Sequence, residues 1–341
     1  MRIYLTGYQP RFFFKSKHTN WWPWNYLAET FKLLGYDAYH MNMNRIDRSR
    51  PAVYICWNAP DSISLIDQYG IHPDSIVVQK LTSFDGSPES ANTNWTERPI
   101  DFFKGWHWPQ YQKLNVLHEK WPKFYAFGAL TDVNSFPEKK KIVDKFKERI
   151  FWIPWGTMTV PYNQIMQSRP LMNGFKYDAG FVGSRWGTKM RGNITEWDAF
   201  LQPLLNQASS YYLAGKGTPK GPVSVKEHVA ALQQSRLCPI IHATSWKVEK
   251  GIMDRFWTVF SLGRFGVVDN EGILSFFNTD EVVLETNPDE YVAKSLYYMK
   301  NPDKQLPFIE KVLTRIQKEY NQKEVWSKIL KRIFAENGLK S

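Results

Sequence analysis

The chain has 341 residues, of which 43% are hydrophobic and 23% are charged, a balance typical of a globular protein with room for two domains. It has two cysteines and no run of about 20 apolar residues, which excludes a disulfide framework, a zinc ribbon and a membrane-spanning helix. The formal net charge of +11 favours polyanionic partners such as nucleic acid, phosphorylated substrates or acidic membrane surfaces, although a basic surface kept for solubility gives the same number.

The first half of the chain alternates between short apolar segments and segments with helical spacing. Because strands that alternate with helices pair in parallel, this half predicts a parallel sheet with helices on its faces. Strands are predicted at 3–6, 36–41, 52–57, 75–81, 124–127 and 150–154, helices at 24–34 and 61–69, and a lysine-rich, solvated helix face around 139–147. The stretch 82–109, rich in Ser, Asn, Pro and Trp, is predicted to be a long irregular loop of the functional kind.

The second half repeats this rhythm after a proline-containing segment, 161–174, which we interpret as a linker. Strands are predicted at 178–182, 210–213, 237–241 and 266–268, and helices at 194–208, 225–234, 255–262 and, as one long run, 304–336. We therefore predict two Rossmann-like α/β domains that face each other across a cleft, at 1–165 and 166–320. The segment 321–341 is predicted to be a helix that crosses back to the first domain.

The turn after the strand 178–182 has the character of a phosphate site. Gly183 and Ser184 end the strand, and a glycine lets backbone amides approach an anion closely. Arginine suits a phosphate because its planar fork donates two parallel hydrogen bonds. Cations lie near this turn or open the later helix of the same domain, namely Arg185, Lys189, Arg191 and Arg255. A strand turn with scattered surface cations is the alternative interpretation.

The order and spacing of several segments resemble the sugar-donor half of the GT-B glycosyltransferases, among them the CgeB-like proteins and the phage DNA β-glucosyltransferases. The matching segments are Phe181–Ser184, Tyr212–Gly215, Gly221–Val223 with Lys226 and Glu227, Ile240–His242, Arg255–Trp257 and Gly266–Asp269. The resemblance extends over about residues 177–330, is weaker before that, and no single motif is specific. It implies a GT-B fold and a nucleotide-sugar donor, of the UDP-sugar class, bound by the C-terminal domain.

The resemblance also implies roles for individual residues of that domain. Gly183, Ser184, Arg191 and Arg255 would hold the diphosphate with help from Lys189 or Arg185, and the segment ending at Gly215 would lie near the base. Thr258 stands where the family usually has a glutamate that holds the ribose, which leaves Asp254 or Glu249 as displaced acids. No essential cofactor and no metal site are implied, although a divalent cation could accompany the diphosphate.

The first domain would bind the acceptor. An inverting transfer needs a base within hydrogen-bond reach of the attacking hydroxyl, and Asp85, four residues after the strand 75–81, is placed like the base of the phage enzymes. An Asp-Gly turn is the alternative for Asp85, and Asp101 and Asp132 are weaker candidates. If transfer retains the configuration, no such base is needed.

Basic residues interleaved with aromatic ones suit contacts to nucleic-acid phosphates and stacking on bases. An enzyme that acts on a base inside duplex DNA must also extrude it, and aromatic wedges hold the opened site. A saccharide-binding surface is the competing interpretation, because carbohydrates also stack on tryptophan rings. The residues concerned are Arg11, Lys15, Lys17, His18, Trp21, Trp22, Trp106 and Trp108.

The leading hypothesis is a glycosyltransferase that moves a sugar from a UDP-sugar to a hydroxymethylated base in phage DNA. A glycosyltransferase for a surface glycan, polysaccharide or protein is the close alternative, and a DNA-binding protein with a degenerate sugar-donor site is the alternative of another class. We expect a monomer with duplex DNA as its partner. Because Met1 to Gly7 form a strand-like start without the apolar core of a signal peptide, we expect it in the cytoplasm, that of the host cell if the protein is viral. The histidines lack metal-binding spacing, and His18 and His242 are the two in cleft loops.

Overall fold

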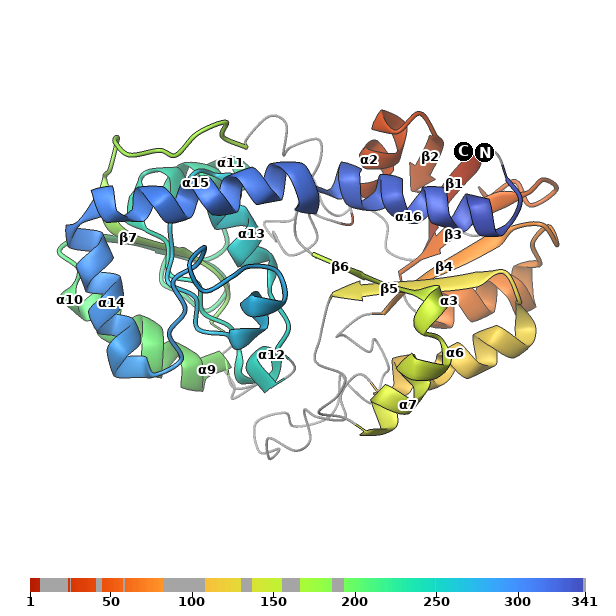
Figure 1. The fold of residues 1–341 in the computed structure, drawn as a ribbon, viewed down its shortest axis with the longest axis horizontal. Helices are drawn as coiled ribbons and strands as arrows, with labels where there is room; N and C mark the ends of the chain where they lie inside the picture. Colours follow the sequence, from red (N-terminus) through yellow and green to blue (C-terminus); the bar gives the residue numbers. More distant parts are fainter. Residues whose placement is uncertain are drawn as a thin grey trace.

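The computed structural model describes residues 1–6, 24, 26–40, 45–57, 59–81, 108–129, 137–154, 166–185, 193–248 and 250–339. These residues form two lobes, each built on a parallel sheet (Figure 1). The N-terminal lobe has a six-stranded sheet, and the C-terminal lobe has a three-stranded one. Both sheets and the covering helices give the α/β class that the sequence predicts.

The N-terminal sheet has the strand order β2-β1-β3-β4-β5-β6, and all of its pairs are parallel. Its strands are β1 (Arg2–Thr6), β2 (Asp37–His40), β3 (Ala52–Cys56), β4 (Ile76–Leu81), β5 (Phe124–Ala129) and β6 (Ile150–Ile153). The helices of this lobe are α2 (Leu27–Leu33), α3 (Ala59–Ser64) with the π-helical turn Leu65–Tyr69, α6 (Trp108–Lys120), α7 (Pro137–Lys145) and the short turn Lys147–Arg149.

Alternate side chains of these strands build two cores, one on each face of the sheet. Ile3, Ile55 and Val78 pack on α2 and on the C-terminal helix. Tyr54 and Val77, from the opposite face, pack with residues of α6 and α7. Because both faces are covered, β3 and β4 are apolar almost throughout, which is why the sequence pattern finds them readily.

The C-terminal sheet has the order β8-β7-β9, again parallel, and single bridges Ile240↔Val268 and Val268↔Leu284 continue it at the β9 side. Its strands are β7 (Tyr177–Val182), β8 (Tyr211–Ala214) and β9 (Ser235–Leu237). Its helices are α9 (Asn193–Glu196), the π-helical Trp197–Leu201, α10 (Gln202–Gln207), α11 (Val225–Gln233), α12 (Thr244–Val248), α13 (Asp254–Ser261), Glu271–Ser275, α14 (Pro288–Lys300), Pro302–Gln305, α15 (Leu306–Arg315) and the π-helical Ile316–Tyr320.

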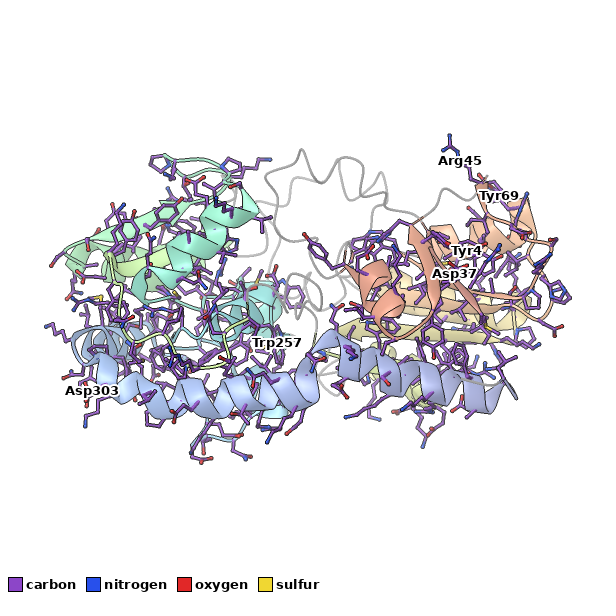
Figure 2. The ribbon with its side chains drawn as sticks, turned by 90° about the horizontal axis from the view of Figure 1, so that it is seen from above. Tyr4, Asp37, Arg45, Tyr69, Trp257 and Asp303 are labelled. Atoms are coloured by element: carbon purple, nitrogen blue, oxygen red, sulfur yellow. The ribbon has the colours of Figure 1, made fainter. Side chains whose placement is uncertain are left out.

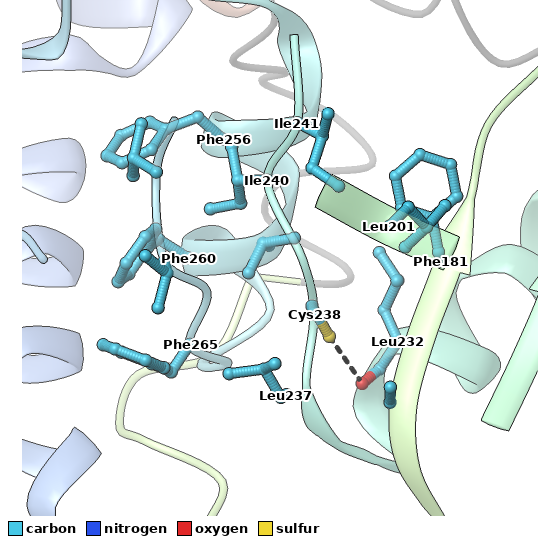
Figure 3. Close-up of a cluster of buried hydrophobic side chains, with 14 of the residues drawn as sticks. Phe181, Leu201, Leu232, Leu237, Cys238, Ile240, Ile241, Phe256, Phe260 and Phe265 are labelled. Carbon is cyan, nitrogen blue, oxygen red and sulfur yellow. Dashed lines mark hydrogen bonds between the residues drawn. The ribbon is translucent and has the colours of Figure 1, made fainter. Parts of the chain in front are cut away.

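The core of this lobe fixes α13 against the sheet. Figure 3 shows Phe256 and Phe260 of α13 on one side of the extended segment that contains Ile240. Phe181 of β7 lies on the other side of that segment, next to Leu201. All five side chains are at least nine-tenths buried. In this core α13 cannot turn about its axis without exposing aromatic surface.

The segment just before β7 is bound to the C-terminal lobe. The amides of Gln167 and Leu171 donate to Ser261 O and Gly263 O, each at 2.9 Å, and Arg264 donates to Leu171 O and Ser235 O. Gly263 has φ +68°, and a Cβ there would lie 2.8 Å from the carbonyl oxygen of Arg169. The described part of the predicted linker is therefore packed, while the domain boundary near 165 lies outside the described residues and stays a prediction.

The C-terminal helix, α16 (Gln322–Glu336), packs on the N-terminal lobe, as the sequence predicts (Figure 1). The ring of Trp326 lies 5.1 Å from that of Phe31 and 4.9 Å from that of Phe127. Tyr125 donates to Glu336 at 2.9 Å. Figure 2, turned by 90°, shows α15 and α16, coloured blue, one after the other along the two lobes.

Three details differ from the sequence prediction. The long helix predicted over 304–336 breaks at Asn321, whose ψ of 150° ends one helix and whose side chain accepts from Glu324 N to begin the next. The strand predicted at 266–268 makes one bridge on each side instead of a ladder. Helices α6, α12 and α14 were not predicted, although Asn287 followed by Pro288 is a helix-start signal for α14.

Trp326 tests the attachment of α16. Replacement of this fully buried ring by alanine leaves a large cavity, so we expect Trp326→Ala to lower the free energy of unfolding by about 3–5 kcal/mol in urea denaturation. Lys331→Ala, on the exposed face of the same helix, should change it by about 0.5 kcal/mol or less. Equal effects of the two variants would show that α16 is not anchored by this contact.

Candidate functional site

The candidate site lies where the carboxyl ends of the C-terminal strands meet. Gly183 N donates to Ala214 O at 2.9 Å and Arg185 N donates to Lys216 O at 2.8 Å, so the turns after β7 and β8 continue side by side. Ligands of open α/β sheets bind at this edge. The first turn of α13 reaches the same edge, because Arg255 Nη1 donates to Ile241 O at 2.6 Å.

Arg255 occupies the space that the missing side chain of Gly183 leaves. A Cβ on Gly183 would lie 2.2 Å from Arg255 Nη2, well inside van der Waals contact. The guanidinium lies 4.0 Å from the centre of the Phe181 ring, within range of a cation–π interaction. Gly183 and Arg255, which the sequence assigns to a diphosphate, are therefore in direct contact although they are 72 positions apart in the chain.

Gly215 and Gly217 bring the turn after β8 onto the same backbone. Gly215 has φ +139°, and a Cβ there would lie 2.0 Å from Gly183 O; a Cβ on Gly217, at φ +80°, would lie 1.9 Å from Arg185 O. Both positions therefore need glycine. In this structure Gly215 packs on the turn that contains Gly183. Its expected place near the nucleotide base stays a prediction.

Toward the residues that the structure describes, the guanidinium of Arg255 has an unused hydrogen-bonding edge. Among these residues Nε has no hydrogen-bond partner, and Nη1 makes one hydrogen bond, to Ile241 O. Burial lowers the pKa of Arg255, while the charges of Asp254 and Asp269 act against that shift. Because an arginine binds a phosphate through two adjacent N–H groups, the free edge can hold one.

The field of Arg255 also acts on His228 of α11. Burial, and then the positive charge of Arg255, lower the pKa of His228 to about 3. Burial also raises the pKa of the Asp254 carboxyl, with Arg255 opposing that rise. The positive charge of Arg255 therefore acts on both neighbouring side chains, while the carboxylates of Asp254 and Asp269 partly offset it.

The remaining predicted sugar-donor residues have different surroundings. Ser184 follows Gly183 and is partly exposed. Arg185 pairs with Asp198 at 3.3 Å and lies 5.9 Å from the ring of Trp197, so it is held by the π-helical segment Trp197–Leu201. Thr258 is 7% exposed in the first turns of α13.

Other predicted site residues lie outside the described residues and stay predictions. For Trp108 the structure gives only its place at the start of α6. The others are Lys189 and Arg191 near the diphosphate, the base Asp85, and the acceptor residues Arg11, Lys15, Lys17, His18, Trp21, Trp22 and Trp106.

A buried charged cluster beside Arg255 was not predicted. The Nδ1 of His242 lies 2.6 Å from Asp269 Oδ1, and Lys247 Nζ lies 2.8 Å from Asp269 Oδ2. Lys247 also pairs with Glu196, which accepts from Thr244 Oγ1 at 2.8 Å. His242 and Asp269 each follow an apolar strand-like segment directly, and this was the signal available in the sequence.

At the corresponding edge of the N-terminal sheet, Lys80 is buried near the end of β4. Its Nζ lies 3.3 Å from the centre of the Trp57 ring, and burial lowers its pKa well below the ordinary value. Lys80 is the last charged residue before the predicted base Asp85. This edge therefore joins a buried lysine and an aromatic ring, and in the sequence the predicted acceptor loop follows directly.

The residues that the structure describes contain no group of three or more His, Cys, Asp or Glu side chains placed to hold a metal ion. Among the helices described, none combines the length and the apolar character needed to cross a bilayer.

Comparison with solved structures gives matches over nearly the whole chain. BGT of phage T4, in complex with its substrate UDP-glucose, matches with a TM-score of 0.57 and 13% identity over 98% of this chain and 99% of that one. The DNA-modifying enzyme β-glucosyltransferase, solved with and without uridine diphosphoglucose, matches at 0.56, with 12% identity over 98% and 99%. HepE of Anabaena, in complex with UDP, matches at 0.53, with 10% identity over 98% and 99%. At these identities the matches show a shared fold.

The neutral state of His228 has a measurable consequence for stability. The folded protein keeps this pKa at about 3, whereas the unfolded chain takes up the proton below about pH 6.5, so the contribution is complete above pH 6.5 and is lost as the pH falls toward 3. Between pH 7 and pH 5 we expect wild type to lose about 2 kcal/mol more than His228→Gln in urea unfolding. If wild type and His228→Gln lost the same free energy of unfolding between pH 7 and pH 5, His228 would not be buried in its neutral form.

The family comparison bears on the candidate site itself. No curated protein matches the chain in sequence. Residues 175–331 match the model of the family described as glycosyl transferase-like, and this range contains Gly183, Gly215, Arg255 and the His242 cluster. Residues 175–331 are therefore similar to the glycosyl transferase-like family, and the chain as a whole has the GT-B fold of the glycosyltransferases that it matches.

Proposed function

We propose that this protein transfers a sugar from a UDP-sugar to a hydroxymethylated base in duplex DNA. The observation that carries the proposal is a fold match, over nearly the whole chain, to the DNA-modifying β-glucosyltransferase and to T4 BGT bound to UDP-glucose. The net charge of +11 suits a polyanionic acceptor. Support also comes from the free edge of Arg255, which lies where a diphosphate could be bound.

On the sugar-donor side, Arg255 would bind the diphosphate through its Nε–Nη2 edge. The backbone of Gly183 and Ser184 would approach the same phosphates, with Lys189 and Arg191 as further cations. Negative charge grows on the leaving diphosphate during transfer, so a guanidinium already fixed against Phe181 and Ile241 O would stabilise the transition state without reorganising.

On the acceptor side, Asp85 would remove the proton from the attacking hydroxyl. It follows β4 by four residues, and β4 ends at the carboxyl edge of the N-terminal sheet. The basic and aromatic residues from Arg11 to Trp22, with Trp106 and Trp108, would contact the DNA backbone and the extruded base. A glycan acceptor is the rival, because tryptophan rings also stack on sugars.

Arg255 offers the sharpest test of the sugar-donor site. We expect Arg255→Ala to weaken UDP binding about tenfold to 100-fold in calorimetry, because a charged hydrogen-bond partner of the diphosphate is lost. The UDP affinity of Arg255→Lys should lie between those of wild type and Arg255→Ala, since lysine keeps the charge but lacks the planar fork. Arg236→Ala removes a partly exposed arginine paired with Asp178 in the same lobe, and should bind UDP like wild type. Undiminished UDP affinity in Arg255→Ala would refute the site.

The acceptor is tested by mass spectrometry of nucleosides. Duplex DNA with 5-hydroxymethylcytosine should gain the mass of a hexose or related sugar when incubated with the protein and a panel of UDP-sugars, whereas DNA with ordinary cytosine should not. We expect Asp85→Asn to abolish transfer while keeping UDP affinity, because the base acts on the acceptor alone. Transfer to oligosaccharides instead of DNA would favour the glycan acceptor, and full turnover by Asp85→Asn would remove it as the base.

A further inference from the structure

His242 is fixed beside the candidate diphosphate site. It directly follows Ile241, whose carbonyl oxygen accepts from Arg255. Its backbone N lies 3.1 Å from both carboxylate oxygens of Asp269, and its Nδ1 lies 2.6 Å from one of them. With 1% of its surface exposed, the ring is held by two points of contact and by burial.

Asp269 is itself anchored as an acceptor. It is fully buried, and Lys247 Nζ, 2.8 Å from its second oxygen, balances its charge. Lys247 is held in turn by Glu196 and lies 3.7 Å from the centre of the Phe200 ring. The contacts of Lys247 with Glu196 and Phe200 connect the cluster to helices α9 and α12 and to the π-helical segment Trp197–Leu201. Such a hydrogen-bonded network holds the imidazole in one orientation.

The contact with Asp269 decides which ring nitrogen is available. A carboxylate has no hydrogen to donate, so Nδ1 must carry the hydrogen of this bond, and the neutral imidazole then presents a lone pair at Nε2. That Nε2 is buried and has no hydrogen-bond partner in the part of the chain that the structure describes. A buried acceptor without a donor is costly, so this atom is suited to a group that a ligand brings.

We infer that His242 accepts, through Nε2, a hydrogen bond from a hydroxyl group of the nucleotide sugar. The inference rests on the proposed function, because it adds a specificity-determining residue to the same site. A diphosphate bound at Arg255 offers no hydrogen, whereas hydroxyl groups flank it on both sides, those of the ribose and those of the transferred sugar. A buried Nε2 that needs a hydrogen-bond donor would make the protein bind nucleotide sugars that have this hydroxyl more tightly than analogues that lack it.

Two substitutions separate this role from support of the fold. An asparagine amide can replace Nδ1 and keep the bond to Asp269, but it has no atom at the position of Nε2. A glutamine amide reaches about the position of Nε2. We therefore expect His242→Asn to lose selection for the hydroxyl and His242→Gln to restore part of it, while a residue that only supported Asp269 would show the reverse order.

The measurement is the affinity of each protein for UDP, 2′-deoxy-UDP, 3′-deoxy-UDP and UDP-glucose by calorimetry. If Nε2 binds the ribose, wild type should prefer UDP to one deoxy analogue by about fivefold or more, and His242→Asn should bind the two equally. If Nε2 binds the transferred sugar, His242→Asn should instead lose the advantage of UDP-glucose over UDP. Affinity ratios that His242→Asn leaves unchanged in both comparisons would overturn the inference.

A spectroscopic readout on the wild-type protein covers the case that His242→Asn does not fold. In protein labelled with ¹⁵N-histidine, the Nε2 resonance of His242, identified by its absence in His242→Gln, should shift when the hydroxyl-bearing ligand is added. No shift under saturating UDP and UDP-glucose would overturn the inference while the proposed function stands. No binding of either ligand by wild type would refute the proposed function, and this inference with it.

Discussion

The close approach of Arg255 to Gly183 is the contact on which the rest of the site depends. The guanidinium can lie against Phe181 and bond to Ile241 O because position 183 has no side chain. The turn after β8 depends on the same absence of side chains, since Gly215 packs on Gly183 O. Two strand ends and the start of a helix thus meet at one point, and the cation there influences His228 and Asp254.

This meeting point is rigid because of the layers beneath it. Phe256 and Phe260 hold α13 in the core, so its first turn has one orientation toward the sheet (Figure 3). The bridge between Ile240 and Val268 sets the register that brings His242 to Asp269. The helices α15 and α16 follow one another along the two lobes: α15 packs on the C-terminal core, and α16 packs on the N-terminal core, in the lobe proposed to bind the acceptor.

The sequence predicted the parts of the fold that depend on local pattern. Strands buried on both faces, such as β3 and β4, are apolar runs that the sequence pattern finds readily. The strand that ends in Gly183–Ser184 near basic residues led to the prediction of a phosphate site, which stays a prediction. The GT-B arrangement came from the resemblance and not from periodicity. The pairing of His242 with Asp269 could not be predicted, because it depends on the register of strands 27 residues apart. Nor could the packing of Gly215 on Gly183, since each glycine alone indicates only a turn.

The central claim is that Arg255, in the space beside Gly183, binds the diphosphate of a nucleotide sugar. The most direct test is a crystal structure of the protein with UDP. It should place a phosphate oxygen within hydrogen-bond distance of Arg255 Nε and Nη2, next to the backbone of Gly183 and Ser184. UDP bound elsewhere, or a diphosphate held without Arg255, would contradict the claim.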